Sequence, residues 1–227
     1  MEIKPSLYIV GTPIGNLSDI SFRAIETLKS VDFVFAEDTR RTKKLFSRYE
    51  ISTPLISCHK FNEARKSKEI IAKINNDKSI ALVTDSGMPC ISDPGSRVIQ
   101  ICREANIPIS VIPGPTALTS AISLAGCSES GFVFHGFLPH KEVGRKKIIE
   151  KYKDYSVPII FYESPYRLLK LLKQVCEVLG EKRFVYVCRE LTKKFEETLE
   201  GTSQEILEAL SDRPVKGEIV VIVMPNK

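Results

Sequence analysis

Apolar and polar positions follow two different periods along the first half of the chain. Short runs of apolar and β-branched residues predict strands over Ser6–Val10, Asp32–Ala36, Pro54–Cys58, Ser79–Thr84 and Ile107–Pro113. Between them apolar residues recur at helical spacing, which predicts helices over Ser21–Ser30, from Thr39, over Asn62–Asn75 and from near Pro94. Because the strands are continuously apolar and alternate with helices, they indicate a mostly parallel sheet that is covered on both faces.

The second half of the chain repeats this alternation less regularly. Pro113–Gly114–Pro115 interrupts the pattern near the midpoint, which predicts one domain over residues 1–113 and another over 114–227. Further strands are predicted over Gly131–Phe137, Val157–Tyr162, Phe184–Glu190 and Glu218–Met224, with an additional antiparallel strand over Glu196–Gly201. The predicted helices cover Thr116–Ala125, Val143–Lys153, Tyr166–Leu179 and Ser203–Leu210. We therefore expect two α/β domains, the second with a mixed sheet.

Composition places the chain among ordinary globular proteins. It has 227 residues, of which 43% are hydrophobic and 27% charged. No apolar run approaches the roughly 18 residues of a membrane helix, and the first residues carry no secretory pattern, so we expect a soluble, cytoplasmic protein without membrane association. The six cysteines form no CxxC pair and the three histidines lack metal-binding spacing. We therefore expect neither a disulfide scaffold nor a metal.

Positive charge is concentrated in three clusters, although the whole chain has only slightly more basic residues (33) than acidic ones (28). The basic residues of these clusters are Arg40, Arg41, Lys43, Lys44 and Arg48; Lys60, Arg65, Lys66 and Lys68; and Lys141, Arg145, Lys146, Lys147, Lys151 and Lys153. A single cluster of this kind is usually a solvated helix face. If the clusters face the same way, however, they indicate a partner that carries phosphate groups.

Three loops follow predicted strands of the first domain, where ligands of open α/β sheets bind. Gly11–Asn16 lacks the GxGxxG and P-loop patterns, so it is either a simple turn or a loop that lets a ligand approach the backbone. Thr84–Gly95 contains two glycines, two prolines and two aspartates, which favours a binding role over a plain connection. The third loop, Pro113–Ala117, ends at the predicted helix start, where free amides suit a hydrogen-bond acceptor.

These loops, together with four other segments, resemble the tetrapyrrole methylase superfamily. The segments are AEDTRRTKKLF from Ala36, FYESPYR from Phe161, CRELTKKFEE from Cys188 and KGEIVVIV from Lys216. The likeness extends from Leu7 to Met224, and YIVGTPIGNLSDISFRA followed by AEDTR points to the branch that methylates ribosomal RNA. Tetrapyrrole-modifying members usually have a Gly-Asp pair at the end of the first loop, which is absent here, and Gly-Gly-Asp-Pro where this chain has Ser86–Pro89.

The resemblance implies a methyltransferase that binds S-adenosylmethionine in a cleft between two α/β domains. It implies a homodimer that acts on ribosomal RNA or the small ribosomal subunit, with 2′-O-methylation of a cytidine in small-subunit (16S) RNA as the reaction. By motif match, the residues expected to line the cofactor are Pro13, Ile14, Ser86, Gly87, Met88, Ile91, Thr116, Ala117, Tyr162 and Leu191.

A ribose hydroxyl is a weak acid, so its methylation benefits from a base nearby. The candidates are Asp85 and Glu163, each at the end of a predicted strand, followed by Glu37, Asp38 and Glu190. Asp85 could instead only tie its own loop together, and Glu163 could instead hold the cofactor. The residues expected to contact RNA phosphates are Arg40, Arg41, Lys44, Lys60 and Arg65, with Phe61, Tyr162 or Tyr166 stacking on a base.

Two other functions remain open from the sequence. A methyltransferase for a tetrapyrrole, another small molecule or a protein side chain would keep the cofactor site and change the acceptor. A non-catalytic RNA-binding module would use the basic surface alone. Labelled cofactor with different acceptors would distinguish the first alternative, and calorimetry with S-adenosylmethionine the second.

Overall fold

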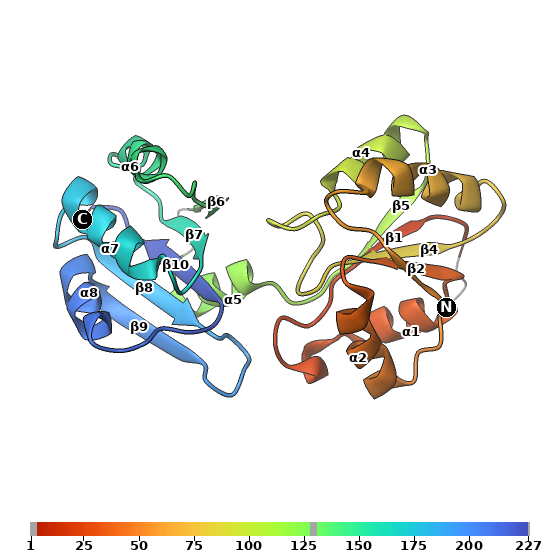
Figure 1. Cartoon of the computed structure of the whole chain (residues 1–227), viewed down its shortest axis with the longest axis horizontal. Helices are drawn as coiled ribbons and strands as arrows, with labels where there is room; N and C mark the ends of the chain where they lie inside the picture. Colours follow the sequence, from red (N-terminus) through yellow and green to blue (C-terminus); the bar gives the residue numbers. More distant parts are fainter. Residues whose placement is uncertain (1–3, 128–130, 227) are drawn as a thin grey trace. The chain divides into compact units, whose positions relative to one another are not determined.

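The computed structural model describes residues 4–127 and 131–226. The chain forms two compact units, Met1–Thr116 and Ala117–Lys227, which are described separately below (Figure 1). We refer to them as the N-terminal unit and the C-terminal unit. The boundary between the two units in the sequence lies after Thr116, three residues beyond the boundary predicted after residue 113.

The N-terminal unit consists of alternating strands and helices. Its elements are β1 (Leu7–Val10), the 3₁₀ turn η1 (Leu17–Asp19), α1 (Phe22–Ser30), β2 (Phe33–Ala36), α2 (Thr39–Tyr49), β3 (Leu55–Ser57), α3 (Glu63–Ile74), β4 (Ile80–Val83), α4 (Ser96–Glu104) and β5 (Ile109–Ile112). Within the described residues of this unit, the strands form a five-stranded sheet in the order β3-β2-β4-β1-β5, and every neighbouring pair is parallel. The predicted parallel sheet is thus confirmed.

Both faces of this sheet are covered by helices, because successive side chains of a strand point to opposite faces. Leu7 and Ile9 of β1 pack in a cluster with α3 and α4, whereas Tyr8 and Val10 pack in a cluster with α1 and α2. Figure 1 shows these two helix pairs on opposite sides of the sheet. The neighbouring strands β1 and β4 therefore lead to helices on opposite faces, α1 and α4, which makes their carboxyl ends a switch point of the topology. Such a point is where open α/β sheets bind ligands.

Side chains cap the starts of α1 and α2. The Ser21 hydroxyl accepts a hydrogen bond from the Ala24 amide (3.1 Å), and the Asp38 carboxylate accepts one from the Arg40 amide (2.9 Å). The start of α4 differs from the prediction, because Pro94 precedes the helix and Gly95 occupies the cap position. The carbonyl of Pro94 instead accepts a hydrogen bond from the Cys90 amide (3.1 Å), so Pro94 belongs to the preceding loop.

The C-terminal unit contains a mixed sheet. Its elements are α5 (Ala117–Ala125), β6 (Val133–Phe137), α6 (Glu142–Lys151), β7 (Ile159–Glu163), α7 (Leu168–Leu179), β8 (Phe184–Arg189), β9 (Glu197–Thr202), α8 (Ser203–Ser211) and β10 (Ile219–Val223). The strand order within its described residues is β6-β7-β10-β8-β9, with β6 parallel to β7 and the other pairs antiparallel. The mixed sheet and the additional strand, β9, are both confirmed.

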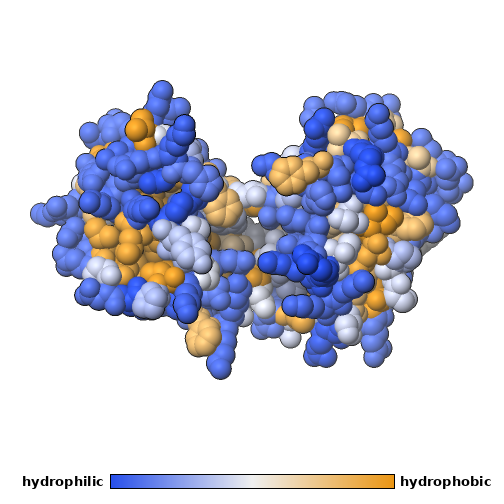
Figure 2. Space-filling model, viewed as in Figure 1, coloured by the Kyte–Doolittle hydropathy of each residue, from blue (hydrophilic) through white to orange (hydrophobic). Residues whose placement is uncertain are grey.

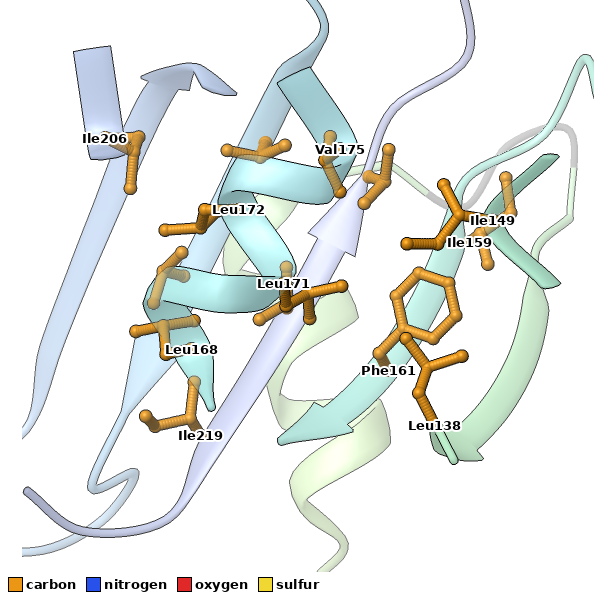
Figure 3. Close-up of a cluster of buried hydrophobic side chains, with 14 of the residues drawn as sticks. Leu138, Ile149, Ile159, Phe161, Leu168, Leu171, Leu172, Val175, Ile206 and Ile219 are labelled. Atoms are coloured by element: carbon orange, nitrogen blue, oxygen red, sulfur yellow. The ribbon is translucent and has the colours of Figure 1, made fainter. Parts of the chain in front are cut away.

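The core of the C-terminal unit lies between this sheet and helices α6, α7 and α8. Leu168, Leu171 and Leu172 of α7 are completely buried, and they share one cluster with Phe161 of β7 and Ile219 of β10 (Figure 3). Helix α5 contacts β10 and lies behind the sheet in Figure 3. Burial of these large apolar side chains supplies the main stabilising free energy of the unit.

The surface is largely hydrophilic, with smaller hydrophobic areas on the face of each unit seen in Figure 2. Among the described residues, no helix has the length and apolar character needed to cross a membrane. The cysteines are all free thiols, and burial raises the pKa of Cys58 to about 12 and that of Cys102 to about 11. These two thiols therefore stay protonated and unreactive at neutral pH.

Candidate functional site

Three loops are tied together at the carboxyl edge of the N-terminal sheet. Thr12 and Gly87 exchange two backbone hydrogen bonds of 2.9 and 3.0 Å, which joins the loop after β1 to the loop after β4. The Thr12 hydroxyl also donates to the Thr84 carbonyl (3.2 Å). The Gly11 amide donates to the Ile112 carbonyl (3.0 Å), which links the first loop to the end of β5. We refer to Gly11–Asn16, Thr84–Gly95 and Pro113–Thr116 as the loop cluster.

Glycines make this close approach possible. A Cβ on Gly11 would lie 2.5 Å from the Met88 sulfur and 2.7 Å from the Gly114 Cα. A Cβ on Gly114 would in turn lie 2.9 Å from the Gly11 Cα. At Gly87 the backbone has φ +81°, which side-chain-bearing residues rarely adopt. The loop cluster is thus a packed arrangement of backbone rather than a set of separate turns.

Most of the predicted cofactor residues of the N-terminal unit lie in this cluster. Ile14 is 6% exposed, and its methyl group would be 3.4 Å from a Cβ on Gly87. The Ile91 amide donates to the Met88 carbonyl (3.4 Å), so the middle of the Thr84–Gly95 loop forms a turn. The predicted residues that the structure brings together here are Pro13, Ile14, Ser86, Gly87, Met88 and Ile91, and Thr116 closes the third loop.

Two buried oxygens near predicted cofactor residues have no hydrogen-bond partner in the part of the chain that the structure describes. They are Thr84 Oγ1, at the start of the long loop, and Glu163 Oε2, at the end of β7. Buried polar atoms are nearly always satisfied by protein, water or a ligand. In the N-terminal unit, Thr84 Oγ1 together with the glycine packing fits a ligand that approaches the backbone closely.

In the C-terminal unit, Tyr162 and Ala117 are brought close together. The Tyr162 hydroxyl accepts a hydrogen bond from the amide of Leu118, the residue after Ala117 (3.1 Å). The Tyr162 ring packs edge-on against Phe134, with 4.9 Å between ring centroids. Tyr162 thus links the end of β7 to the start of α5.

Glu163 is the most buried carboxylate among the candidates. Its side chain is 0% exposed, and Oε1 lies 2.6 Å from Arg167 Nη2 and 2.7 Å from the Ser164 amide. Arg167 also donates to the Leu138 carbonyl (3.1 Å), so the pair joins the loops after β6 and β7. Glu163 therefore organises this edge of the C-terminal sheet.

Asp85 and Glu37 join the loops after β4 and β2. The Asp38 amide donates to Asp85 Oδ1 (2.9 Å), and the Asp85 amide donates to Glu37 Oε2 (3.4 Å). Burial raises the pKa of Asp85, although the Asp38 amide and Arg41, whose Nε lies 3.4 Å from Asp85 Oδ2, oppose this effect. Burial and then repulsion from Asp85 raise the pKa of Glu37. Raised pKa values of this kind are typical of functional carboxyls.

The other two acidic candidates have lowered pKa values. Hydrogen bonds from Arg40 lower the pKa of Asp38 to about 2. Burial acts to raise the pKa of Glu190, but hydrogen bonds from Lys193 (2.8 Å) and the Glu218 amide (2.9 Å) outweigh it and lower the pKa. Both groups are therefore poor proton acceptors at neutral pH. Leu191, next to Glu190, is buried at the end of β8.

The predicted RNA-contacting residues lie on two elements that follow neighbouring strands. Arg40, Arg41 and Lys44 are on α2 after β2, whereas after β3 Lys60 lies in the turn before α3 and Arg65 in the first turn of that helix. All five side chains are exposed. Arg40 and Arg41 pair with Asp38 and Asp85, but in the described residues the other three make no ion pair.

The exposed aromatic residues distinguish the stacking candidates. Phe61, beside Lys60, is 92% exposed, and Tyr166 is 89% exposed. Tyr162 is instead packed against Phe134 with its hydroxyl engaged. Phe61 and Tyr166 are therefore the rings available for stacking.

The third basic cluster does not form one surface. Arg145 is only 4% exposed, and its Nε donates to the Gln174 side chain (2.9 Å). Lys146 pairs with Glu142 and Glu177 at 3.2 and 2.8 Å. Burial therefore removes Arg145 from any surface that the three clusters could share, whereas Lys146 is ion-paired but 40% exposed.

Four residues of the site were not predicted. Thr12 and Gly114 lie inside predicted loops, but only the packing identifies what they contact. Arg167 lies four residues after Glu163, but Glu163 ends β7 and Arg167 precedes α7, so helical ion-pair spacing does not apply and only the structure shows their contact. Glu63 accepts a hydrogen bond from the Gly95 amide, 32 residues away, and no pattern in the sequence indicates this contact.

Comparison with known proteins identifies the family. The model of the tetrapyrrole (corrin/porphyrin) methylases matches residues 6–207. The chain belongs to the tetrapyrrole methylase family. The resemblance stated from the sequence is thus confirmed.

Two relatives in this family are similar over nearly the whole chain. A Thermotoga maritima protein named ribosomal RNA small subunit methyltransferase I is 42% identical over 217 residues, covering 96% of this chain and 97% of its own length. A Vibrio cholerae protein of the same name is 44% identical over 222 residues, covering 96% of this chain and 77% of its own.

A solved structure of the tetrapyrrole methylase fold is also similar. The uroporphyrin-III C-methyltransferase of Thermus thermophilus, crystallised with S-adenosylhomocysteine, has a TM-score of 0.67 and 15% identity. The similarity covers 96% of this chain and 97% of that one. At 15% identity, this structural similarity shows the shared fold, and that fold is the expected pair of α/β domains.

Proposed function

We propose that this tetrapyrrole methylase-family protein transfers the methyl group of S-adenosylmethionine to the 2′-hydroxyl of a cytidine in small-subunit (16S) ribosomal RNA. The observation that carries the proposal is the shared edge of the N-terminal sheet, where exposed basic residues flank the loop cluster. Arg41 contacts Asp85 across this edge at 3.4 Å. The names of the two relatives, at 42% and 44% identity, support ribosomal RNA as the acceptor.

S-adenosylmethionine supplies a methyl group that its sulfonium already activates, so the protein chiefly has to align the reactants. The glycine packing lets a ligand reach backbone groups of the loop cluster, and Thr84 Oγ1 is a free acceptor or donor there. The residues that we assign to cofactor binding are Pro13, Ile14, Ser86, Gly87, Met88, Ile91, Thr116, Ala117, Tyr162 and Leu191.

Asp85 is the proposed base for the ribose hydroxyl. Its side chain is 22% exposed at the edge of the loop cluster, and burial raises its pKa toward the range in which a carboxylate accepts a proton effectively. Glu163 has a fully buried side chain and pairs with Arg167. We therefore assign Glu163 to organising the cofactor side of the C-terminal unit.

Arg40, Arg41, Lys44, Lys60 and Arg65 are the proposed phosphate contacts. A single-stranded segment that crosses these residues would place a base next to the exposed ring of Phe61. Tyr166 would offer a second stacking surface. The protein is proposed to act in the cytoplasm as a homodimer, and sedimentation of the purified protein tests the dimer.

A methylation assay tests the function. The purified protein is incubated with labelled S-adenosylmethionine and either 16S RNA or isolated small subunits, and the RNA is digested and mapped by mass spectrometry. We expect one added methyl group on a cytidine ribose. Label in added tetrapyrroles or proteins, but not in RNA, would favour another acceptor. Failure to bind S-adenosylmethionine in calorimetry would favour a non-catalytic RNA-binding role.

A further inference from the structure

The Thr84–Gly95 loop has an unusual backbone. Four of its residues have positive φ angles: Gly87 (+81°), Cys90 (+74°), Ser92 (+64°) and Gly95 (+124°). Cys90 and Ser92 carry a Cβ, so this conformation is disfavoured for them. Strained residues of this kind persist only where surrounding contacts hold them, and they are frequent in ligand-binding loops.

Contacts at both ends hold this loop. At its start, Gly87 is bridged to Thr12 by two backbone hydrogen bonds. At its end, the Gly95 amide donates to the carboxylate of Glu63, the first residue of α3. Glu63 is only 8% exposed, so water competes little for this charge-assisted hydrogen bond. Gly95 has no side chain that could cap α4, so the hydrogen bond from its amide to Glu63 fixes the end of the loop to α3.

The same glutamate follows directly after an RNA-facing loop. His59–Asn62 presents Lys60 and the exposed ring of Phe61. This loop is internally ordered, because the His59 amide donates to the Asn62 side chain (2.9 Å) and the Phe61 amide donates to His59 Nδ1 (3.3 Å). A displacement of this loop would therefore move the first turn of α3 and, with it, the Glu63 carboxylate.

We propose that Glu63 is a positioning residue that holds the Thr84–Gly95 loop in its cofactor-binding conformation and couples it to RNA bound at His59–Asn62. The coupling rests on the proposed function, whereas the holding of the loop does not. Both ligands stabilise the same arrangement of α3 and the loop. RNA therefore tightens cofactor binding, and the cofactor tightens RNA binding by the same factor.

Three substitutions at Glu63 and one control test this role. Glu63→Ala removes the acceptor, Glu63→Asp keeps the charge but shortens its reach, and Glu63→Gln keeps an acceptor of the same length. The control is Glu69→Ala on the same helix, because Glu69 is 37% exposed and pairs with Lys66 (2.6 Å). Hydrogen exchange over residues 84–95 is measured without ligand. S-adenosylhomocysteine affinity is measured by calorimetry, with and without a 16S RNA transcript.

We expect faster exchange over residues 84–95 and at least about tenfold weaker S-adenosylhomocysteine binding in Glu63→Ala and Glu63→Asp. Glu63→Gln should stay within about threefold of the wild type, since a neutral acceptor still satisfies the amide. Glu69→Ala should match the wild type in both measurements. RNA should tighten S-adenosylhomocysteine binding in the wild type and in Glu63→Gln, but not in Glu63→Ala.

Unchanged exchange in Glu63→Ala, or a Glu63→Gln variant as impaired as Glu63→Ala, would overturn the positioning role. An RNA effect that persists in Glu63→Ala would overturn the coupling. If Glu63→Ala fails to fold, the comparison of Glu63→Asp with Glu63→Gln decides instead. A wild-type protein that does not bind S-adenosylhomocysteine would refute the proposed function, while the exchange measurement would still decide whether Glu63 holds the loop.

Discussion

Replacing Gly11 by alanine tests the packing of the loop cluster. The new Cβ would lie 2.5 Å from the Met88 sulfur and 2.7 and 2.8 Å from the Gly114 Cα and amide nitrogen. Ordinary contacts between such atoms are about 3.5–4 Å, so the atoms are roughly 1 Å too close. The Met88 side chain can rotate away, but the Gly114 backbone moves only if the loop after β5 moves with it.

The expected cost of this overpacking is about 1–3 kcal/mol, and part of it is relieved by displacing loops of the proposed cofactor site. We therefore expect Gly11→Ala to weaken S-adenosylhomocysteine binding at least about tenfold, since a tenfold change corresponds to about 1.4 kcal/mol. Calorimetry measures the affinity, and a thermal melt without ligand measures the loss of stability.

Two further variants make the test specific. Gly114→Ala should have the same effect, because its Cβ would lie 2.9 Å from three backbone atoms of Gly11. Gly144→Ala, in α6, is the control, because its Cβ would meet only two side-chain atoms of Pro139, at 3.3 and 3.6 Å, and no backbone of another loop. Wild-type affinity and melting temperature in Gly11→Ala would refute the argument that this packing excludes a side chain.

Three other predictions follow from the structure. Replacing both Arg40 and Arg41 by alanine should reduce the slope of log affinity for RNA against log salt concentration by about 0.7 per lost phosphate contact, with cofactor affinity unchanged; an unaltered slope rejects these contacts. Asp85→Asn should lower the single-turnover rate by about 10²–10⁴-fold. Because burial raises the pKa of Asp85, the wild-type rate should begin to fall at a higher pH than an ordinary aspartate would give, as Asp85 becomes protonated. This acidic limb of the pH–rate profile should vanish in Asp85→Asn. A full single-turnover rate in the variant would show that Asp85 is not the base. Leu171→Ala, at a completely buried position of α7, should destabilise the C-terminal unit by about 2–5 kcal/mol in urea unfolding, and a cost below about 1 kcal/mol would contradict the packing in Figure 3.

The fold could be predicted largely from local patterns. Continuous apolar runs such as Ile80–Val83 indicate strands buried on both faces, and helical spacing between them indicates parallel connections. The antiparallel β9 was also predicted from its short segment. The helix expected from near Pro94 begins two residues later, at Ser96, because the Pro94 carbonyl accepts a hydrogen bond from the Cys90 amide inside the loop. Helix-start preferences alone do not indicate this contact.

The sequence by itself determined the two α/β domains, the loops at the strand ends and the family, because each depends on residues that are near one another along the chain. Only the tertiary structure decided which of these loops touch, that Gly11 and Gly114 leave no room for a Cβ, and that Glu63 reaches Gly95. It also separated the charged candidates by burial, leaving Lys60 in solvent and Arg145 in the interior. Contacts and burial of this kind depend on which distant segments fold together, and hydrophobic periodicity carries no information about such pairs.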